Sequence, residues 1–394
     1  MSDAPPVLQA SGRMPWPTLS ILALGGFAIG TEGFVVAGIL GGIARDLDVP
    51  VAVAGQTVTV FAVAYAVGAP LLTGLTSGVR LRRVLVTSMA LFAVFNLLAA
   101  AATSIWMLDL WRALCAGAAG LYLPAAAGAA SRLVPDRYRG RALAVVLGGQ
   151  SAGTVLGAPL GIVVEQQLSW RGTFVLVAGL ALVAVVGLAL RGPAVGTADP
   201  LPLRERLAPL RSPELLLSLV VTTVGMTGGY APYTYLGPLF GPDPDIGERW
   251  LSLLVAAFGL GGVLGAWCGG SLADRWGAQR AISVSLGLMT LNFVLSPLTA
   301  TTLPSALAFL VAWGITGWAF LPAQQHKLVG LMAGQAPLVI SLNASAVYVG
   351  IASGAALGGV VVATVGAGSL WMVAAGCGAF ALLVHTLSGR PDRR

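Results

Sequence analysis

Three charged residues lie inside long apolar stretches of the sequence: Glu32, Asp109 and Arg112. A charge in such a stretch is costly to keep and is therefore a first candidate for chemistry. At 1.5 Å per helical residue, Glu32 and Arg112 each lie roughly 20 Å from the same face of the protein, so the two can meet. Burial disfavours a carboxylate and a nearby guanidinium favours it, and this balance would let Glu32 take up and release a proton. The alternative is an ion pair with a purely structural role.

Asp109 precedes Arg112 by three residues and so shares roughly one helix face with it. If Arg112 also engages Asp109, Glu32 is left freer to titrate. Asp109 is thus a second candidate for proton coupling, although it could instead lie at the outer end of its segment.

The segments that carry these charges belong to a chain of 394 residues that is 57% hydrophobic and 9% charged, with a mean hydropathy of +0.86. Soluble domains carry about a quarter charged residues, so a water-soluble fold is excluded. Apolar stretches long enough to cross a hydrocarbon core of about 30 Å recur along the chain. They predict twelve transmembrane helices, at residues 19–42, 52–75, 84–103, 105–131, 141–164, 171–191, 214–240, 250–273, 279–300, 303–325, 336–363 and 367–388.

Proline and arginine residues after the sixth helix divide the chain into two halves. We expect five segments: an N-terminal segment at 1–18, a six-helix bundle at 19–191, a linker at 192–213, a second bundle at 214–388 and a tail at 389–394. Glycines recur at four-residue spacing in the fifth and eleventh helices, one repeat apart, which predicts close helix contacts in two similar halves. Chance in a chain so rich in glycine is the alternative. These glycines are Gly149, Gly153, Gly157 and Gly161, and Gly350, Gly354 and Gly358.

Arginines gather in alternate loops, for example at 80–83 and 132–141. By the positive-inside rule, these loops, the linker and both termini are cytoplasmic. Because the positive charges form no single stripe, the net charge of +7 does not indicate a nucleic-acid partner. The cysteines Cys115, Cys268 and Cys377 show no metal-binding spacing. We therefore expect no metal and no cofactor.

Two further stretches suggest moving parts. In the fifth helix, Pro159 follows Gly153 and Gly157, and a proline inside a helix removes a backbone hydrogen bond and permits a hinge. At the end of the eighth helix, an acid and basic residues form a turn that could cap a helix and act as a gate latch. The latch residues are Asp274, Arg275 and Arg280.

Together these stretches resemble the major facilitator superfamily, and within it the twelve-helix drug:proton antiporters that include bacterial chloramphenicol and sugar exporters. Residues 270–280 are similar to its gating motif, and Arg112 with Gly117 to its helix-4 arginine motif. Residues 153–161 resemble its antiporter motif, and residues 30–38 its acidic helix-1 signature. The gating motif expected between the second and third helices lacks its acid here, so the latch of the first half must differ.

The resemblance implies two pseudo-symmetric bundles around a central cavity that opens alternately to each side. Each aromatic candidate for its lining could equally face lipid or pack between helices. The polar or aromatic candidates at mid-depth are, besides Glu32 and Arg112, Phe34, Asn96, Tyr122 and Gln150 from the first half and Tyr230, Tyr233, Trp267, Trp313, Trp318, Asn343 and Tyr348 from the second.

The leading hypothesis is a monomeric transporter in a bacterial inner membrane that exports a small, fairly hydrophobic compound, driven by protons through Glu32. Export of a polar metabolite, such as a sugar, nucleoside or amino-acid derivative, stays open, and the antiporter motif disfavours uptake. A non-transporting sensor would not need Glu32. An enzyme is disfavoured because His326 and His385 lie near helix ends without a catalytic constellation.

Overall fold

The computed structural model describes residues 14–76, 78–193, 196–197, 208–241, 246–332 and 335–388. The predicted tail at 389–394, most of the N-terminal segment and most of the linker lie outside these residues. Within them, twelve helices are long and apolar enough to cross a membrane. This confirms the predicted fold class, an all-α polytopic membrane protein. Helices are expected because backbone polar groups in lipid must be paired within their own segment.

The first half contains six spans, two of which are interrupted. Their elements are α1 Trp16–Asp46, α2 Val51–Ala54 with α3 Gln56–Leu75, α4 Leu81–Ala100, α5 Ile105–Arg132, α6 Arg139–Ala152 with a π-helix Gly153–Gly157 and α7 Ala158–Gln167, and α8 Trp170–Arg191.

The second half repeats this arrangement. Its elements are α10 Pro213–Thr234 with α11 Leu236–Phe240, α12 Leu251–Trp276, α13 Ala278–Thr299, α14 Leu303–Leu331, α15 Ala336–Thr364 and α16 Leu370–Ser388. Local chemistry sets several of these bounds. For example, the Ser212 hydroxyl accepts a hydrogen bond from the Leu215 amide at 3.3 Å, and Pro213 fills the first helical position, which needs no donor.

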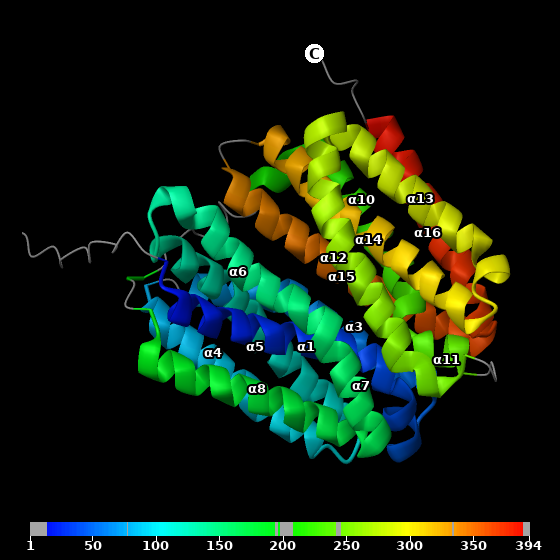
Figure 1. Ribbon diagram of the computed structural model, residues 1–394, viewed down its shortest axis with the longest axis horizontal. Helices are drawn as coiled ribbons and strands as arrows, with labels where there is room; N and C mark the ends of the chain where they lie inside the picture. Colours follow the sequence, from blue (N-terminus) through cyan, green and yellow to red (C-terminus); the bar gives the residue numbers. More distant parts are fainter. Residues whose placement is uncertain are drawn as a thin grey trace, which may run out of the picture.

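The two halves form separate six-helix bundles that lie side by side (Figure 1). In the first, α1 packs against α6 and α8, and in the second α10 packs against α15 and α16 in the same way. Both predicted glycine ladders lie in these seams. A side chain at Gly153 would meet the Phe27 carbonyl of α1, and one at Gly354 would meet the Thr227 carbonyl of α10. The close helix contacts predicted from the ladders are confirmed.

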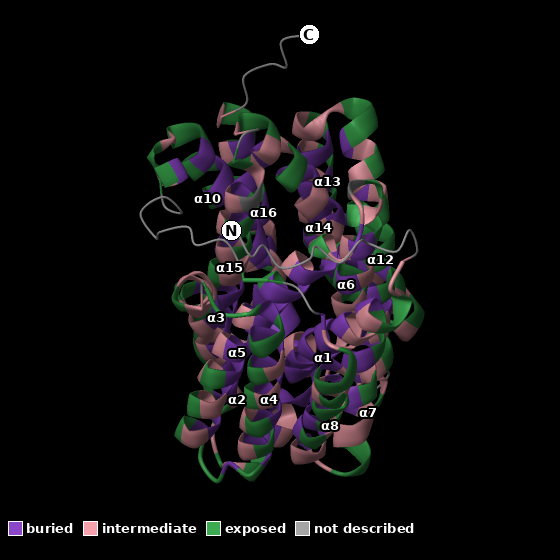
Figure 2. Cartoon of the chain, turned by 90° about the vertical axis from the view of Figure 1, so that its left-hand side faces the viewer, coloured by how far each residue is buried: buried purple, intermediate pink, exposed green. Residues whose placement is uncertain are grey.

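We call the side of the protein where α1 begins the Trp16 face and the side where it ends the Asp46 face. The two halves touch from the Asp46 face to about mid-depth. Near that face, the Tyr235 hydroxyl donates hydrogen bonds to the carbonyls of Ala355, at 3.0 Å, and Ala52, at 3.4 Å. Figure 2 shows the buried residues of each bundle at its centre and the exposed ones around its rim.

Three details differ from the sequence prediction. α14 continues to Leu331 rather than ending at 325, because Lys327 finds a partner in His385 of α16 at 3.5 Å. The seventh span breaks at Tyr235. Asp274 caps no helix: it lies in the last turn of α12, and the N-cap of α13 is Gly277, whose φ of 82° makes the tight turn.

On the Trp16 face, arginines of the first half bind backbone carbonyls. Arg82 donates to Ala189 at 2.5 Å, and Arg132 donates to Thr197, in the first part of the linker, at 2.6 Å. Arg80 forms an isolated antiparallel bridge with Thr197. Carbonyl groups thus partner the side chains of Arg82 and Arg132 in the half whose gating motif lacks an acid.

Candidate functional site

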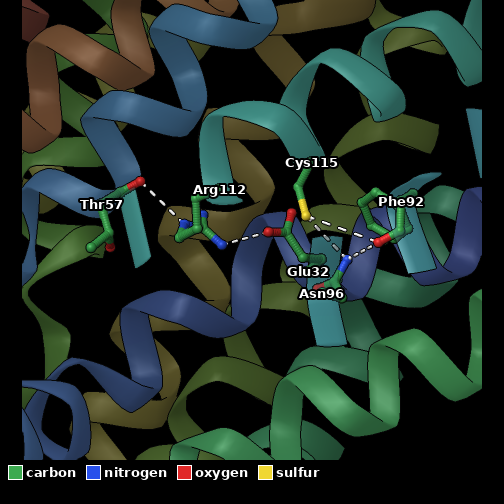
Figure 3. Close-up of polar contacts among 6 residues, drawn as sticks. All are labelled: Glu32, Thr57, Phe92, Asn96, Arg112 and Cys115. Atoms are coloured by element: carbon green, nitrogen blue, oxygen red, sulfur yellow. Dashed lines mark hydrogen bonds and ion pairs between the residues drawn. The ribbon is translucent and has the colours of Figure 1, made fainter. Parts of the chain in front are cut away.

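The two charges singled out in the sequence form an ion pair inside the first bundle. Arg112 reaches from α5 between two partners, the Glu32 carboxylate of α1 and the Thr57 carbonyl of α3 (Figure 3). Its Nη1 donates to Glu32 Oε1 at 2.5 Å, and its Nε donates to Thr57 O at 3.2 Å. Glu32 is 0% and Arg112 1% exposed. The predicted meeting of Glu32 and Arg112 is confirmed.

The pair leaves one carboxylate oxygen without a partner. Among the described residues, Glu32 Oε2 accepts no hydrogen bond although it is buried, and the same is true of Thr57 Oγ1 and Asn96 Oδ1. Asn96 lies on α4 beside Cys115 and donates to the Phe92 carbonyl at 2.8 Å (Figure 3). A buried oxygen without a donor costs roughly 1–3 kcal/mol, and a proton on the carboxyl group would reduce that cost. The geometry therefore suits a carboxyl group that changes its charge.

Aromatic rings enclose the guanidinium. The Arg112 Cζ lies 4.8 Å from the centre of the Phe61 ring on α3 and 6.0 Å from that of Phe174 on α8. Such rings exclude water and attract the cation through their faces. Asp109 lies one turn towards the Asp46 face, is half-buried, and has an Oδ1 atom that no described residue binds. Among the described residues, Arg112 forms its ion pair with Glu32.

An aromatic wall of the second half packs against α1. Phe34, two residues after Glu32, packs against Tyr230, Tyr233 and Trp318, with ring centroids 6.1, 5.9 and 5.8 Å away. The Tyr233 hydroxyl donates to the Phe34 carbonyl at 3.3 Å. Trp313 extends the wall, 6.3 Å from Tyr233. Five predicted lining residues thus lie together, and one of them, Phe34, is on the same helix as Glu32.

Cavities lie on both sides of this wall. A narrow one of about 30 Å³, room for about one water molecule, lies behind it between α10, α12, α13 and α14. One of about 120 Å³ lies between the π-helix and α12 and shares Trp318 with the first. The largest, about 420 Å³, lies near the Asp46 face between α1, α7, α11 and α12. The second and third of these cavities lie between the two halves, whereas the first lies within the second half.

Three predicted lining residues lie elsewhere. Tyr122 is buried within the first bundle, where its hydroxyl donates to the Leu22 carbonyl at 3.0 Å. Gln150 presents its backbone to Gly30 in the seam between α1 and α6. Trp267 is 75% exposed and lines none of the three cavities. Two of these residues hold helices together, and the third lies on the surface of α12.

Two other predicted residues lie within contact networks. Tyr348 of α15 stacks on Tyr65 of α3, and Asn343 accepts a hydrogen bond from Thr222 of α10 at 2.9 Å. Sequence reasoning missed Thr222 and its other partner Gln324, because the run of polar residues at 324–327 marked the expected end of the tenth helix. A polar side chain on the apolar face of that helix was the available signal.

The predicted gating residues divide into two groups. Asp274, Arg275 and Arg280 are exposed on the Trp16 face. Gly153 and Gly157 bound the π-helix, and Pro159 follows at the start of α7. π-Helices are uncommon and often mark places where a helix deforms in function, which agrees with the hinge expected here from the sequence.

Comparisons with known proteins agree with this architecture. The model of the Major Facilitator Superfamily matches residues 22–336. A chloramphenicol resistance protein of Streptomyces lividans is 33% identical over 346 residues, covering 86% of this chain and 88% of its own. A chloramphenicol efflux pump of Mycobacterium tuberculosis is 30% identical over 369 residues, covering 90% and 89%. A crystal structure of a mutant nucleoside transporter, NupG, is similar in fold, with a TM-score of 0.73 at 12% identity over 95% of this chain and 100% of that one.

Proposed function

The chain belongs to the major facilitator superfamily, and on that premise we propose that it exports a small, fairly hydrophobic compound in exchange for protons, with Glu32 as the proton carrier. The observation that carries the proposal is the position of Glu32, which is fully buried, bound through Oε1 to Arg112 and, among the described residues, without a partner at Oε2. Burying a carboxyl group in this way costs free energy, so such a group inside a membrane protein usually has a function.

The arginine distribution supports placing the Trp16 face in the cytoplasm. Both termini and the linker then lie on that side, in a bacterial inner membrane. The contacts between the halves lie on the opposite side, from the Asp46 face to mid-depth, for example through Tyr235. We take this arrangement as the state that receives the compound from the cytoplasm.

Protons then drive the return step. In the outward-open state, a proton from outside reaches Glu32 past the half-buried carboxyl group of Asp109. Protonation removes the charge that holds Arg112, which changes the packing of α1 against α5. Phe34 lies half a turn along α1 and touches the aromatic wall, so the same helix touches the second half. This contact supports a coupling of proton binding to the movement of one bundle against the other.

The nature of the wall supports a fairly hydrophobic compound. Tyr230, Tyr233, Trp313 and Trp318 offer ring faces and no charge. Two relatives are named for chloramphenicol, which makes that compound the first probe. Export of a polar metabolite is the second candidate, and the buried polar side chains around Gln324 favour it.

The test uses the purified protein in liposomes with a pH-sensitive dye inside. A chloramphenicol gradient should move protons in the opposite direction through the wild type. Glu32→Gln should abolish this movement while it retains exchange of labelled chloramphenicol for unlabelled. Proton movement that persists in the variant would remove Glu32 from the pathway. Absence of any exchange across a wider panel of drugs and metabolites would contradict transport itself.

A further inference from the structure

The cavity near the Asp46 face is large enough for a small molecule. Its volume is about 420 Å³, whereas the cavities beside the aromatic wall hold about 30 and 120 Å³. Small-molecule sites occupy roughly 300–1,000 Å³. Among the residues that the structure describes, this cavity shares no lining residue with the other two. A compound bound there would therefore be separate from the aromatic wall. We call this space the outer cavity.

Both halves supply the walls of the outer cavity. The first half contributes the last turns of α1, the start of α2 and the end of α7, and the second half contributes α11 and the first residue of α12. Two of the lining residues, Arg45 and Gln166, are also exposed, so the cavity is open to water at the Asp46 face. A compound can therefore enter from that side without passing the aromatic wall.

The charged side chains of the outer cavity belong to the first half. Arg45 lies in the last turn of α1, and Glu165 lies near the end of α7. Glu165 reaches across the seam between these helices, because a Cβ atom at Gly42 of α1 would lie 2.5 Å from its Oε1. The described lining residues of the second half carry no charge and include Pro238 and Leu251. The cavity thus has one charged wall and one largely apolar wall.

The charged wall carries one charge of each sign. Asp46, the next residue on α1, is not among the described lining residues, and its carboxylate binds Arg171 and the Trp170 Nε1 of α8. An ion of either sign in the outer cavity would therefore meet one like charge. A compound that carries both charges can place each beside its opposite, which is the complementary arrangement.

We propose that the outer cavity binds a zwitterionic compound with an apolar side chain, and that the bound compound holds the two halves together at the Asp46 face. Its ammonium group contacts Glu165, its carboxylate contacts Arg45, and its side chain packs against Pro238 and Leu251. Both walls are present only while the halves touch on this side, so binding favours this arrangement over the outward-open one. The effect on the halves rests on the proposed export cycle, whereas the binding site does not.

The first test measures binding by calorimetry on the purified protein in detergent. Its three probes share one skeleton: L-phenylalanine carries both charges, 2-phenylethylammonium only the positive charge and 3-phenylpropionate only the negative charge. We expect the wild type to bind phenylalanine about tenfold more tightly than either ion, the worth of one hydrogen bond to a charged group.

Two charge variants test the orientation of the compound. In Glu165→Gln the ammonium group loses its partner and 3-phenylpropionate no longer meets a like charge, so this anion and phenylalanine should bind about equally. In Arg45→Gln the same should hold for 2-phenylethylammonium and phenylalanine. Asp48→Asn is the matched control, because Asp48 is exposed on the same face and is not among the described lining residues. It should change the binding of no probe.

A larger side chain tests the place of binding. A Cβ atom at Gly237, which lines the outer cavity, would meet Leu251 Cδ2 at an ordinary 3.8 Å and no described atom closer. Gly237→Leu should therefore fill the cavity and abolish the binding of all three probes. Gly179→Leu adds the same side chain on α8, where a Cβ atom meets nothing within 4 Å, and should leave binding unchanged.

The second test adds phenylalanine outside liposomes that contain the protein, at a concentration above its measured Kd. It should slow chloramphenicol export by the wild type. It should slow export by Glu165→Gln much less, relative to the rate of that variant without phenylalanine.

Three results would overturn the proposal. Phenylalanine that fails to bind the wild type, or binds Gly237→Leu as tightly, would exclude the outer cavity. Tighter binding of either ion than of phenylalanine would exclude a zwitterion. Binding of phenylalanine without slower export would exclude the effect on the halves. If chloramphenicol is not transported at all, the proposed export fails, whereas calorimetry still decides the binding site.

Discussion

Tyr65 of α3 and Tyr348 of α15 stack across the boundary between the two halves, with ring centroids 3.7 Å apart and planes 18° from parallel. Tyr65 also neighbours Phe61, 6.4 Å away, and Phe61 is the ring beneath the Arg112 guanidinium. Packed rings therefore connect the partner of Glu32 to the second bundle. Closely packed contacts of this kind have discrete arrangements, so a change at the ion pair can alter the contact between the halves.

Removal of the stack should therefore weaken coupling more than folding. We expect Tyr348→Ala to lower the number of protons moved per compound exported in liposomes, while exchange without a gradient continues. Tyr348→Phe retains the ring face and should keep the wild-type ratio. A stack with only a structural role would lower the thermal stability of Tyr348→Ala and leave the ratio unchanged.

Asp109 should affect the rate of proton uptake rather than its stoichiometry. It lies towards the proposed outer side of Arg112 and is only half-buried. We expect Asp109→Asn to slow export roughly tenfold, equivalent to about 1.4 kcal/mol in the barrier, with the proton ratio retained. Raising the external pH should slow the variant further, because fewer protons reach Glu32. Asp46→Asn, in an ion pair with Arg171 at the same face, is the control and should leave the rate unchanged.

The ion pair was predictable because its signal is local. Glu32 and Arg112 are conspicuous in apolar segments, and the rise of a helix places them at one depth without knowledge of the packing. The same reasoning gave the helices and the glycine seams. The contact between Tyr65 and Tyr348 depends on how two bundles meet, and no spacing within either helix encodes that.

The same limit on prediction from sequence applies to the aromatic and polar residues. Trp313 and Trp267 both lie in apolar helices of the second half, yet one is 2% and the other 75% exposed. Which face of a membrane helix meets protein and which meets lipid is weakly marked in sequence, because both faces are apolar. Gln324 was missed for a related reason: polar residues follow it, and these resembled a helix end.

The stability of the ion pair gives a third prediction. Arg112→Met leaves the buried Glu32 carboxylate without its counter-charge, and breaking a buried pair in this way costs roughly 3–5 kcal/mol. We expect a clear fall in melting temperature in detergent at neutral pH. The fall should shrink as the pH is lowered, because a protonated Glu32 needs no counter-charge. The double variant Glu32→Gln with Arg112→Met should recover most of the loss, and a double variant no more stable than Arg112→Met would contradict this account.

The π-helix gives the last prediction. At Gly153, a Cβ atom would meet the Phe27 carbonyl of α1, whereas at Gly148, five residues earlier on α6, it would meet nothing within 4 Å. Both changes to alanine favour a regular helix by up to about 1 kcal/mol, since glycine is the poorer helix former. Only Gly153→Ala must also push α1 away from α6, and with it Glu32.

We therefore expect Gly153→Ala to slow export and lower the melting temperature, and Gly148→Ala to preserve export with equal or higher stability. Equal effects of the two variants on transport would mean that helix regularity, rather than the close approach of α1, governs the rate. Normal transport by Gly153→Ala would mean that the seam between α1 and α6 yields without cost, and would remove the π-helix from the transport cycle.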